Sequence, residues 1–534
     1  MADAPTPAAV PLSTAPPAVR GAAAALTMST LAFTVCFSAW MLNGVLATFL
    51  VYEGVFPWSK AQLGWLIGIP VLTGSLARLP VGILTDKYGG RIVFTILILL
   101  SAIPMFLLSY ADSYASYALA SLGFGFVGSS FAVGIAYTSV WFSKERQGTA
   151  LGVFGVGNVG SALTSIAAPI LLGWLTSQRT DIEGWRALPR IYAGALVVTA
   201  IVFFAFTKTR VVEGGRTATM RQRLAPLKEV RVWRFGLYYF LVFGGFVALA
   251  GWLTPYYVSV YSMSLATAGL MTSIFSWPAS VIRALGGWMS DRFGARRVMY
   301  WVLFTCVGGF ALLCVPRMEI NSPGEGVLAY KPGTVKAVFP ERVVVADKAG
   351  TESVYPVRSK PGGFRTLAEQ DSDLMVLPTG TSWQEPVVKA GDAVKGKQLL
   401  ARGTTHVYFQ ANVWIFTTIL LGVGIMMGIG KAAVYRHIPD YFPKAVGVVG
   451  GIVGVLGGLG GAVGPILFGY LLQGTGIWTT CWIFFLALSI VCLVWMHAVV
   501  QKMMRQRAPA LSQQIEDRLH APSGEADAAP RVRA

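Results

Sequence analysis

Two arginines stand inside long apolar stretches of this chain, Arg78 in the segment SLARLPVGILTDKYGGR and Arg283 in the segment SVIRALGGWMSDRFGARR. A guanidinium group stays protonated and presents a planar fork of hydrogen-bond donors. That fork suits a small planar oxyanion, so the two residues together could bind such an anion. At the centre of a membrane-spanning helix each charge costs about 2.5 to 3.5 kcal/mol, so both are expected to face an interior pathway rather than lipid.

The sequence offers these arginines no acidic partner inside the apolar stretches. Aspartate and glutamate occur at the ends of the stretches and in the loops between them. A bound anion is therefore the predicted counter-ion. The alternative is that each arginine pairs with a buried carboxylate and serves only to hold helices together.

Composition and hydropathy indicate many membrane-spanning helices. Of the 534 residues, 54% are hydrophobic and 13% are charged, with a mean hydropathy of +0.59, whereas a soluble domain carries about 25% charged residues. Apolar stretches of roughly 20 residues, long enough to span a bilayer, are expected at 22–50, 61–84, 92–110, 114–142, 148–175, 187–207, 235–260, 266–289, 297–316, 411–434, 446–473 and 478–500. Most are rich in glycine and alanine, which permits close helix packing. The predicted fold class is an all-α membrane bundle of twelve helices.

The net charge of +18 follows membrane topology rather than nucleic-acid binding. Lysine and arginine gather in alternate connections, richest between Lys208 and Arg234, while the intervening loops hold few. By the positive-inside rule, both termini are expected in the cytoplasm and the chain in a bacterial-type cytoplasmic membrane, with the lipid bilayer as a partner. No recognition motif for nucleic acid accompanies the charge, so no nucleic-acid partner is predicted.

The two arginine segments are copies of one pattern. Each arginine precedes an aspartate by eight residues, and the shared or motif positions are Gly82, Asp86, Gly89 and Arg91 in the first copy and Gly287, Asp291 and Gly294 in the second. Such a repeat implies two parallel six-helix halves, and the pattern resembles the loop motif of the major facilitator superfamily. The aspartates are predicted to form a conformational latch with arginines or with a helix N-terminus. The alternative is a static turn with solvated charges.

The predicted organisation follows from this repeat. Its parts are a disordered N-terminus at 1–21, a six-helix half at 22–207, a basic linker at 208–234, helices seven to nine at 235–316, an extracytoplasmic insertion at 317–408, helices ten to twelve at 409–500 and a cytoplasmic tail at 501–534, polar and disordered beyond about 505.

Two helices carry dense glycine runs. The glycines are Gly152, Gly155, Gly157 and Gly160 around Asn158 in the fifth helix, and Gly454, Gly457, Gly458, Gly460 and Gly461 in the eleventh. A nucleotide-binding loop would need a preceding strand in a soluble domain, which is absent from the sequence pattern here. In a bilayer the glycines permit close helix contact, and the Asn158 amide could donate a hydrogen bond to an anion. The alternative for both runs is packing alone.

These features together resemble the nitrate/nitrite porter family. The resemblance rests on the run G-V-G-N-V-G at 155–160, its glycine-rich counterpart, and the arginines in R-L-P and R-A-L-G-G. It implies that nitrate binds between Arg78 and Arg283. It further implies that Asn158 is the helix-five amide, that Tyr239 and Phe243 are the helix-seven aromatics, and that Phe131 is the helix-four aromatic. The alternative is that Tyr239 and Phe243 are ordinary packing residues.

Within that family, the segment GKAAVYRHIPDYFPKAVGVVGG at 430–451 resembles the proton-linked uptake branch more than the exchange branch. Protons are therefore expected as a partner beside nitrate or nitrite. Lys431 and His437 are the candidates for a proton pathway. Lys431 could instead be a snorkelling charge at a helix end, and His437 an interfacial residue.

The insertion at 317–408 alternates β-type runs such as RVVVAD and LMVLPT with glycine and proline, which predicts a small β-rich unit. Residues 387–403 resemble half of a biotinyl/lipoyl-type barrel, but the modified-lysine hairpin is missing, so no cofactor is expected. The unit could dock a protein partner, cap the entrance, or only stabilise a loop.

The sequence thus predicts a secondary transporter that moves nitrate or nitrite by alternating access, with proton-coupled nitrate import favoured. The alternatives are a nitrate/nitrite antiporter, a carrier of a small carboxylate such as formate or oxalate, and a membrane sensor that uses the β-rich insertion. Catalysis is not expected, because no nucleophile–base pair or metal-ligand spacing is present, and all five cysteines lie in predicted helices.

Overall fold

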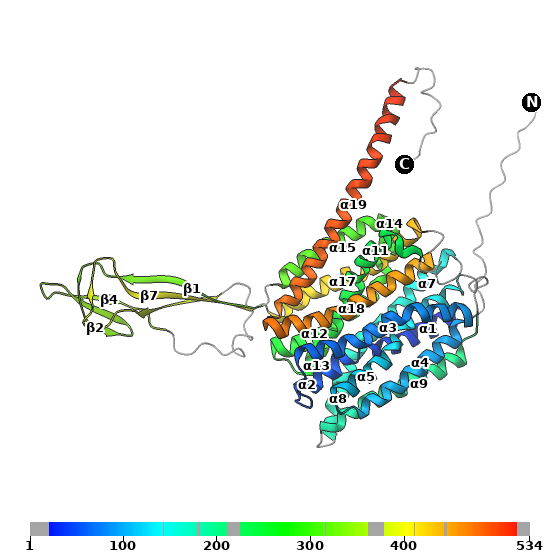
Figure 1. Ribbon diagram of the computed structural model, residues 1–534, viewed down its shortest axis with the longest axis horizontal. Coiled ribbons are helices and arrows are strands. Elements are labelled where there is room, and N and C mark those ends of the chain that lie inside the picture. The colour runs from blue at the N-terminus through cyan, green and yellow to red at the C-terminus, as the bar shows by residue number, and fades with distance from the viewer. Residues whose placement is uncertain are drawn as a thin grey trace, which may run out of the picture.

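A computed structural model describes residues 21–142, 144–178, 182–210, 225–314, 317–360, 379–410, 412–442 and 446–520. The chain forms a helical bundle from which a β-sheet unit projects at one end, between α15 and α17, as Figure 1 shows. We call this the insertion end and the opposite one the loop-motif end. The N-terminal tail predicted at 1–21 lies, apart from Gly21, outside the described residues.

The N-terminal half carries the first six spans. Its elements are α1 (Ala22–Trp40), α2 (Asn43–Tyr52), α3 (Lys60–Tyr88), α4 (Gly90–Leu107), η1 (Leu108–Tyr110), α5 (Tyr114–Phe124), η2 (Gly125–Ser129), α6 (Ser130–Ser139), α7 (Lys144–Gly155), η3 (Val156–Val159), α8 (Gly160–Gln178), η4 (Ile182–Arg186) and α9 (Ala187–Phe206). Helix α3, which carries Arg78, begins with a capping box in which Ser59 and Gln62 bond each other's backbone N–H groups.

The C-terminal half repeats this arrangement. Its helical elements are η5 (Ala225–Lys228), α11 (Val230–Tyr239), η6 (Phe240–Gly244), α12 (Gly245–Tyr261), α13 (Leu265–Val281), α14 (Arg283–Phe293), α15 (Ala295–Leu313), α17 (Val413–Tyr441), α18 (Val446–Thr475) and α19 (Thr479–His520). Helix seven begins at Val230, inside the linker predicted at 208–234.

The described residues contain 11 helical spans long and apolar enough to cross a membrane, and 12 when the bent pair α13 and α14 is taken as one span. The predicted all-α bundle of twelve helices is therefore confirmed. The two parts of the bent pair meet at Ile282 at an angle of 43°. Pro278 lies one turn earlier and has no N–H to donate to the preceding turn, which is a common cause of helix bending.

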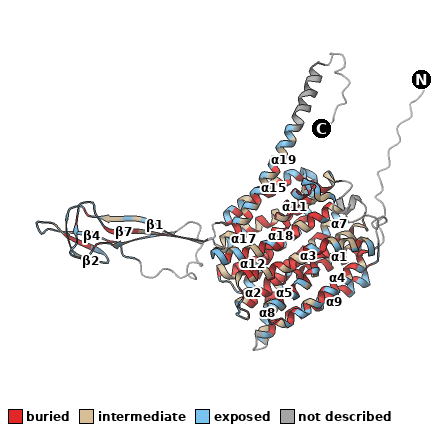
Figure 2. Cartoon of the chain, in the orientation of Figure 1, coloured by how far each residue is buried: buried red, intermediate tan, exposed pale blue. Residues whose placement is uncertain are grey.

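The outer surface of the bundle is suited to lipid. Large apolar side chains are exposed on the outward faces of the helices, including Leu100, Ile103, Leu119, Ile201 and Phe304, and Figure 2 shows the buried residues between the helices. A soluble protein rarely leaves so many large apolar groups in water. The chain is a multi-pass membrane protein.

The two halves meet closely at the insertion end. A Cβ atom at Gly44 would lie 2.9 Å from the Cα atom of Gly251, and one at Gly64 would collide with the carbonyl oxygen of Pro465. The Ala61 N–H also donates to the Gln473 side chain, which ties α3 to α18. Backbone contact of this kind depends on glycine, as the composition predicts.

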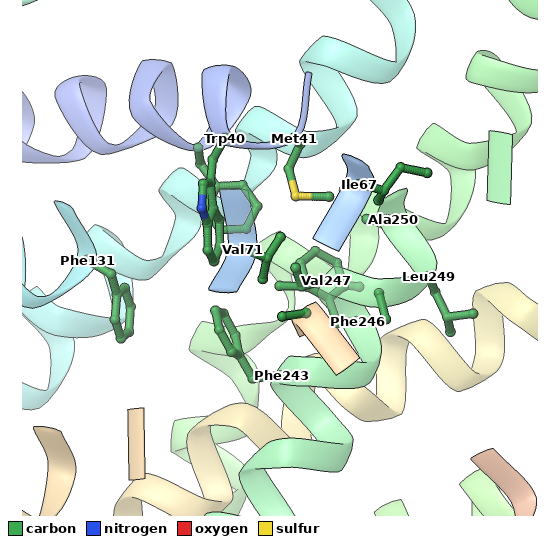
Figure 3. Close-up of a cluster of buried hydrophobic side chains, with 14 of the residues drawn as sticks. Trp40, Met41, Ile67, Val71, Phe131, Phe243, Phe246, Val247, Leu249 and Ala250 are labelled. Atoms are coloured by element: carbon green, nitrogen blue, oxygen red, sulfur yellow. The ribbon is translucent and has the colours of Figure 1, made fainter. Parts of the chain in front are cut away.

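An apolar layer closes the space between the halves beside these contacts. Figure 3 shows Trp40, Met41, Ile67 and Val71 from the N-terminal half and Phe243, Phe246, Val247 and Ala250 from the C-terminal half in this layer, all of them buried. The layer separates the insertion end from the level of the arginines, because Val71 and Ile67 lie about two and about three turns before Arg78 on α3.

The insertion is a small β unit, as predicted. Its strands are β1 (Arg317–Leu328), β2 (Gly333–Phe339), β3 (Arg342–Ala346), β4 (Glu352–Pro356), β5 (Thr379–Pro386), β6 (Ala393–Val394) and β7 (Leu399–Gln410). They form a three-stranded sheet in the order β1-β7-β5 and a four-stranded sheet in the order β4-β3-β2-β6. Val335, Val343, Val345, Tyr355 and Leu400 belong to a separate hydrophobic core inside this unit.

The C-terminal tail differs from its prediction. Helix α19 continues to His520, whereas the sequence was interpreted as polar and disordered after about residue 505. The residues from Gln501 to His520 include many strong helix formers such as Gln, Lys, Arg, Met and Leu, and a helix already nucleated in the bundle can extend along them. Residues 521–534 lie outside the described residues.

Candidate anion-binding site

Arg78 is buried in the interior of the bundle at the boundary between the two halves. Its side chain is 3% exposed, and its Nη1 atom donates to the Gly454 carbonyl of α18 at 2.5 Å. Its Nε and Nη2 atoms have no hydrogen-bond partner. The Nη1 atom thus bonds the opposite half, and the Nε and Nη2 donors could bind a ligand.

Arg283 occupies the equivalent place in the C-terminal half. It is 7% exposed, and its Nη1 atom has no hydrogen-bond partner. It approaches the opposite half at Gly155 of α7, where an added Cβ atom would lie 3.0 Å from the Arg283 Cδ atom. Both arginines are thus buried in the interior, and both guanidinium groups lie beside the Phe131 ring.

The structure gives neither arginine an acidic partner among the described residues, where the ion pairs Arg186–Glu183, Lys336–Glu352 and Arg436 with Asp291 and Asp440 lie elsewhere. Removing two positive charges from water without a counter-ion is costly. The unpartnered donors of Arg78 and Arg283 therefore form a site that is electrostatically complementary to an anion.

Aromatic rings lie beside both guanidinium groups. The Phe131 ring centroid lies 5.2 Å from the Arg78 Cζ atom and 5.5 Å from the Arg283 Cζ atom. Phe243 lies 5.1 Å from Arg78 and stacks on Phe131 with centroids 6.0 Å apart. A planar anion held between two rings needs about 7 Å between them, from two contacts of roughly 3.5 Å. With centroids 6.0 Å apart the two rings contact each other, so they would have to move apart to admit a planar ion between them.

Tyr239 and Phe243 share one face, as their spacing predicts. Their rings are parallel with centroids 5.0 Å apart, and Tyr239 lies near both arginines. The chain between them is the π-helical segment η6. A π-turn is uncommon and often occurs at functional sites.

Asn158 lies in the short 3-10 segment η3 of the fifth span. It is fully buried, and neither its Nδ2 nor its Oδ1 atom has a hydrogen-bond partner. It stands three residues after Gly155, hence on the same helix face, and Gly155 contacts Arg283. The amide is the kind of uncommitted donor that the predicted role requires.

Irregular backbone recurs at this level of the bundle. The 3-10 segment η2 directly precedes α6 and Phe131, η3 surrounds Asn158, η6 connects Tyr239 to Phe243, and the bend at Ile282 directly precedes Arg283. Helix α3 is unbroken at Arg78. Departures from regular helix within a membrane are tolerated where the backbone is buried in protein or lines an interior space.

The glycine-rich helices make room for the site residues. A Cβ atom at Gly458 would collide with Ser75 and lie 3.1 Å from the Arg78 Nη1 atom, and one at Gly457 would collide with the Tyr239 ring. Gly454 supplies the carbonyl that accepts from Arg78. Farther along the same helix, Gly460 and Gly461 pack against Phe240 and Val247. In the fifth span, Gly157 and Gly160 pack against Phe33 and Thr34 of α1, and the Cβ position of Gly152 is open.

The loop-motif residues lie at the opposite end from the insertion. Gly89 and Gly294 have φ angles of 86° and 84°, a conformation that favours glycine, and they join α3 to α4 and α14 to α15. Asp291 accepts from Arg436 of α17 at 2.6 Å. Gly82 and Gly287 have open space at the Cβ position, so they are not needed for packing in this structure.

Arg91, the arginine of the first loop motif, also contacts a helix of its own half. The Arg91 Nη2 and Nε atoms donate to the Phe204 carbonyl of α9 at 2.7 Å and 3.1 Å. With the Asp291–Arg436 pair, these contacts join helices of the same half. The predicted latch between conformations stays a prediction.

The two proton-pathway candidates occupy different surroundings on α17. Lys431 is fully buried, and its Nζ atom lies 3.3 Å from the ring centroid of Phe246. His437 stacks on Phe235 with centroids 5.6 Å apart, six residues, or about 9 Å along the axis, closer to the loop-motif end. The structure brings Lys431 near Arg283 and groups His437 with Phe235 and Tyr441.

Sequence reasoning missed four neighbours of the site. Trp40 lies 5.6 Å from the Arg78 Cζ atom, Tyr435 lies 5.9 Å from the Arg283 Cζ atom, Ser75 packs on Gly458, and Phe246 lies under Lys431. Helical spacing could have identified Ser75, three residues before Arg78, and Tyr435, four after Lys431. Phe246 could be identified in the same way, because it lies three residues after Phe243 in the same span. Trp40 comes from another helix, and no local signal indicates it.

The chain is similar in sequence to a well-characterised superfamily of transporters. The model of the Major Facilitator Superfamily matches residues 6–324 and 399–525, on both sides of the insertion. The chain is 38% identical over 497 residues to the "Probable nitrate/nitrite antiporter NarK1" of Thermus thermophilus, covering 92% of this chain and 94% of that protein.

More distant relatives carry related names. The "Probable nitrate/nitrite transporter NarK2" of Mycobacterium tuberculosis is 34% identical over 65% of this chain and 88% of its own length. The "Nitrite extrusion protein" of Bacillus subtilis is 28% identical over 58% of this chain and 75% of its own length.

Solved structures are similar in fold. A bacterial homologue of the lysosomal transporter Spinster, in an inward-facing and occupied conformation, aligns with a TM-score of 0.59 at 12% identity, covering 91% of this chain and 98% of that one. The nucleoside transporter NupG aligns with a TM-score of 0.54 at 12% identity, covering 89% and 98%. At this identity the similarity concerns the fold alone.

Proposed function

We propose that this chain, which belongs to the Major Facilitator Superfamily and is related to its nitrate/nitrite transporters, exchanges nitrate for nitrite across a membrane. The superfamily comprises transporters, so the chain is a transporter and not an enzyme. Exchange is our choice over the proton-linked import favoured by the sequence, because the relative that matches 92% of the chain is named an antiporter.

One observation carries the proposal: two buried guanidinium groups from opposite halves have unpartnered donors beside the same ring, Phe131. A monovalent planar oxyanion would accept hydrogen bonds from both and offset part of their charge. We assign the further hydrogen bonds to Asn158 and Tyr239, and the walls of the slot to Phe131 and Phe243. These roles are proposals from position and chemistry.

The charge of the site also favours exchange. An empty carrier would have to reorient with Arg78 and Arg283 facing each other without a counter-ion, which is electrostatically unfavourable. A bound anion reduces that penalty, so the halves rock past each other mainly when nitrate or nitrite is present. Nitrate and nitrite carry the same charge, so one can replace the other in either direction.

The experiment is counterflow in proteoliposomes. Vesicles loaded with nitrite receive external labelled nitrate, with and without a protonophore, and the same vesicles without internal nitrite serve as reference. We expect nitrate uptake to depend on internal nitrite and to persist when the proton gradient is collapsed. Uptake that requires an inward proton gradient and ignores internal nitrite would replace exchange by symport.

Variants and competitors test the site in the same assay. Arg78→Lys and Arg283→Lys should lose counterflow, whereas Arg402→Lys, at an exposed position of β7, should match the wild type. External nitrite should compete with nitrate, and formate and oxalate should not. Competition by the carboxylates without competition by nitrite would instead indicate a small-carboxylate carrier.

We further propose that both termini face the cytoplasm and the insertion faces the other side. The argument is the basic residues in the loops at the loop-motif end. A reporter enzyme that is active only outside the cytoplasm should be active when fused within the insertion and inactive when fused after Ala534. The reverse pattern would invert the orientation.

A further inference from the structure

A fully buried lysine has no part in the exchange mechanism above. Lys431 on α17 is 0% exposed, and its Nζ atom has no hydrogen-bond partner. The face of the Phe246 ring, 3.3 Å from the Nζ atom, is its close electrostatic contact. An aromatic face attracts an ammonium ion but accepts no conventional hydrogen bond in place of water. Burial in such surroundings makes the protonation of a lysine responsive to nearby charges.

The nearby charge is Arg283. Helices α14 and α17 are in backbone contact, since a Cβ atom at Gly286 would lie 2.7 Å from the Cα atom of Ile429. Arg283 is three residues from Gly286, and Lys431 is two residues from Ile429. Arg283 acts on Lys431 electrostatically, as one positive charge on another.

The other helices around Lys431 supply no negative charge among the described residues. Tyr239 on α11 and Tyr435 on α17 flank Arg283 and contact each other edge to face, with ring centroids 5.0 Å apart. At Gly430, the residue before Lys431, the neighbours from η6 and α15 are Val242 and Val302. His437 lies farther along α17, against Phe235.

We propose that Lys431 is a proton-binding site linked to the anion: it gains a proton when the anion binds and loses it when the anion leaves. In the empty site the two guanidinium groups repel a third positive charge. An anion between them reduces this repulsion, and proton binding in turn strengthens anion binding, because such coupling is reciprocal. The step is protonation of the amine to the ammonium, with the proton taken from hydronium or a buffer acid on the side from which the anion enters and returned to water where the anion leaves.

This inference rests on the proposed function for the identity of the anion and adds a second activity to it. A carrier loaded with anion and proton on one side, and emptied of both on the other, can return with one positive charge fewer than a carrier whose lysine is always charged. Proton-coupled net uptake then becomes possible beside exchange. It would explain how one site could support either mode of transport.

The test is calorimetric titration of nitrate into the purified full-length protein at one pH, in buffers that differ in ionisation enthalpy. The dependence of the measured heat on buffer gives the protons taken up per nitrate bound. The wild type should take up a substantial fraction of one proton at a pH between about 6 and 9, and its nitrate affinity should fall with rising pH, by at most about tenfold per unit.

Two variants locate the proton. Lys431→Gln removes the charge, and Lys431→Arg makes it permanent, so both should reduce proton uptake per bound nitrate to near zero. Lys395→Gln, at an exposed position of the insertion, should behave as wild type. If the glutamine variant does not give monodisperse protein, Lys431→Met replaces it, since an unbranched apolar chain fills the same space over Phe246.

Two results would overturn the proposal. One is nitrate binding to the wild type without proton uptake across this pH range. The other is unchanged proton uptake per nitrate in the Lys431 variants, which would direct attention to His437. Failure of the proposed function would look different, because wild-type nitrate uptake would then not depend on internal nitrite, or nitrate would give no binding heat at all.

Discussion

Arg78 and Arg283 occupy equivalent positions of a sequence repeat but unequal positions in space. Arg78 lies within the unbroken helix α3 and donates to the Gly454 carbonyl. Arg283 follows a 43° bend, and no backbone carbonyl accepts from it among the described residues. The duplication has preserved the residue and its burial, while, among the described residues, a backbone carbonyl anchors only the Arg78 guanidinium.

The two arginines nevertheless contact the opposite half in the same way. Arg78 of the second span meets the glycines of α18, and Arg283 of the eighth span meets Gly155 of α7. The environment of each guanidinium group therefore depends on the position of the opposite half. The difference is that, of the two arginines, Arg78 alone joins the halves by a hydrogen bond within the described ranges, so the two sites should respond differently to substitution.

The largest effects should follow from the arginines themselves. Arg78→Lys should lower kcat/KM for nitrate counterflow about 1000-fold and Arg283→Lys about 100-fold, within the range for breaking buried charged hydrogen bonds. Arg78 must serve Gly454 and the anion at once, and lysine lacks the planar fork for both. Labelled-nitrate counterflow in proteoliposomes measures this, and equal losses would contradict the distinction between an arginine anchored to a backbone carbonyl and one without that anchor.

Substitutions at the glycines that contact the two arginines should also differ in their effect on transport. Gly458→Ala would force its Cβ atom into Ser75 beside Arg78, so transport should fall tenfold or more, as overpacking by 1 to 3 kcal/mol implies. Gly155→Ala meets the flexible Arg283 side chain at 3.0 Å and should cost about twofold to threefold. Gly152→Ala has open space and is the matched control. A larger loss at Gly155 than at Gly458 would reverse the comparison.

The bend before Arg283 can be reduced by Pro278→Ala, which restores a backbone N–H group for the preceding turn. A straighter α13–α14 should displace the Arg283 guanidinium and lower counterflow severalfold while nitrate still binds. Pro80→Ala in the unbroken helix α3 is the matched variant in the other half and should have less effect. The comparison fails if the Pro80 variant is the more impaired of the two.

The loop motif should affect rate more than stability. Asp291→Asn removes the exposed ion pair with Arg436, whose side chains are 65% and 44% exposed, so the unfolding free energy should change by less than about 1 kcal/mol. If the motif is a latch, transport by Asp291→Asn and Asp86→Asn should change about twofold to fivefold at normal protein levels. Unchanged kinetics in both variants would leave the motif as a turn.

Removal of the β insertion, which lies in the C-terminal half, should have the smallest effect on transport. Arg317 and Gln410 are paired at the base of β1 and β7, so a short Gly-Ser linker can replace residues 317–410 without stretching the chain. Figure 1 shows the sheets standing away from the bundle, and counterflow should remain within about twofold of the wild type. A loss beyond tenfold in well-folded protein would support the capping role.

Local sequence predicted the elements and many contacts of the site. Hydropathy indicated the twelve spans. The spacing of arginine, glycine and aromatic residues indicated the repeat, the interior position of Arg78 and Arg283, and the pairing of Tyr239 with Phe243 on one helix face. These features depend on periodicity along one helix or on composition, which the sequence displays directly. The extension of α19 was missed because polar residues suit both a disordered tail and an exposed helix.

The sequence by itself determined the class of the protein: apolar spans of bilayer length, a duplicated half, and buried cations without a carboxylate. Only the tertiary structure decided that Gly454 holds Arg78, that a bend sets Arg283 apart from it, and that Lys431 lies near Arg283 over the Phe246 ring. The physical reason is that these contacts join helices distant in sequence. Their geometry depends on how closely glycine-containing backbones pack, which periodicity along a single helix does not encode.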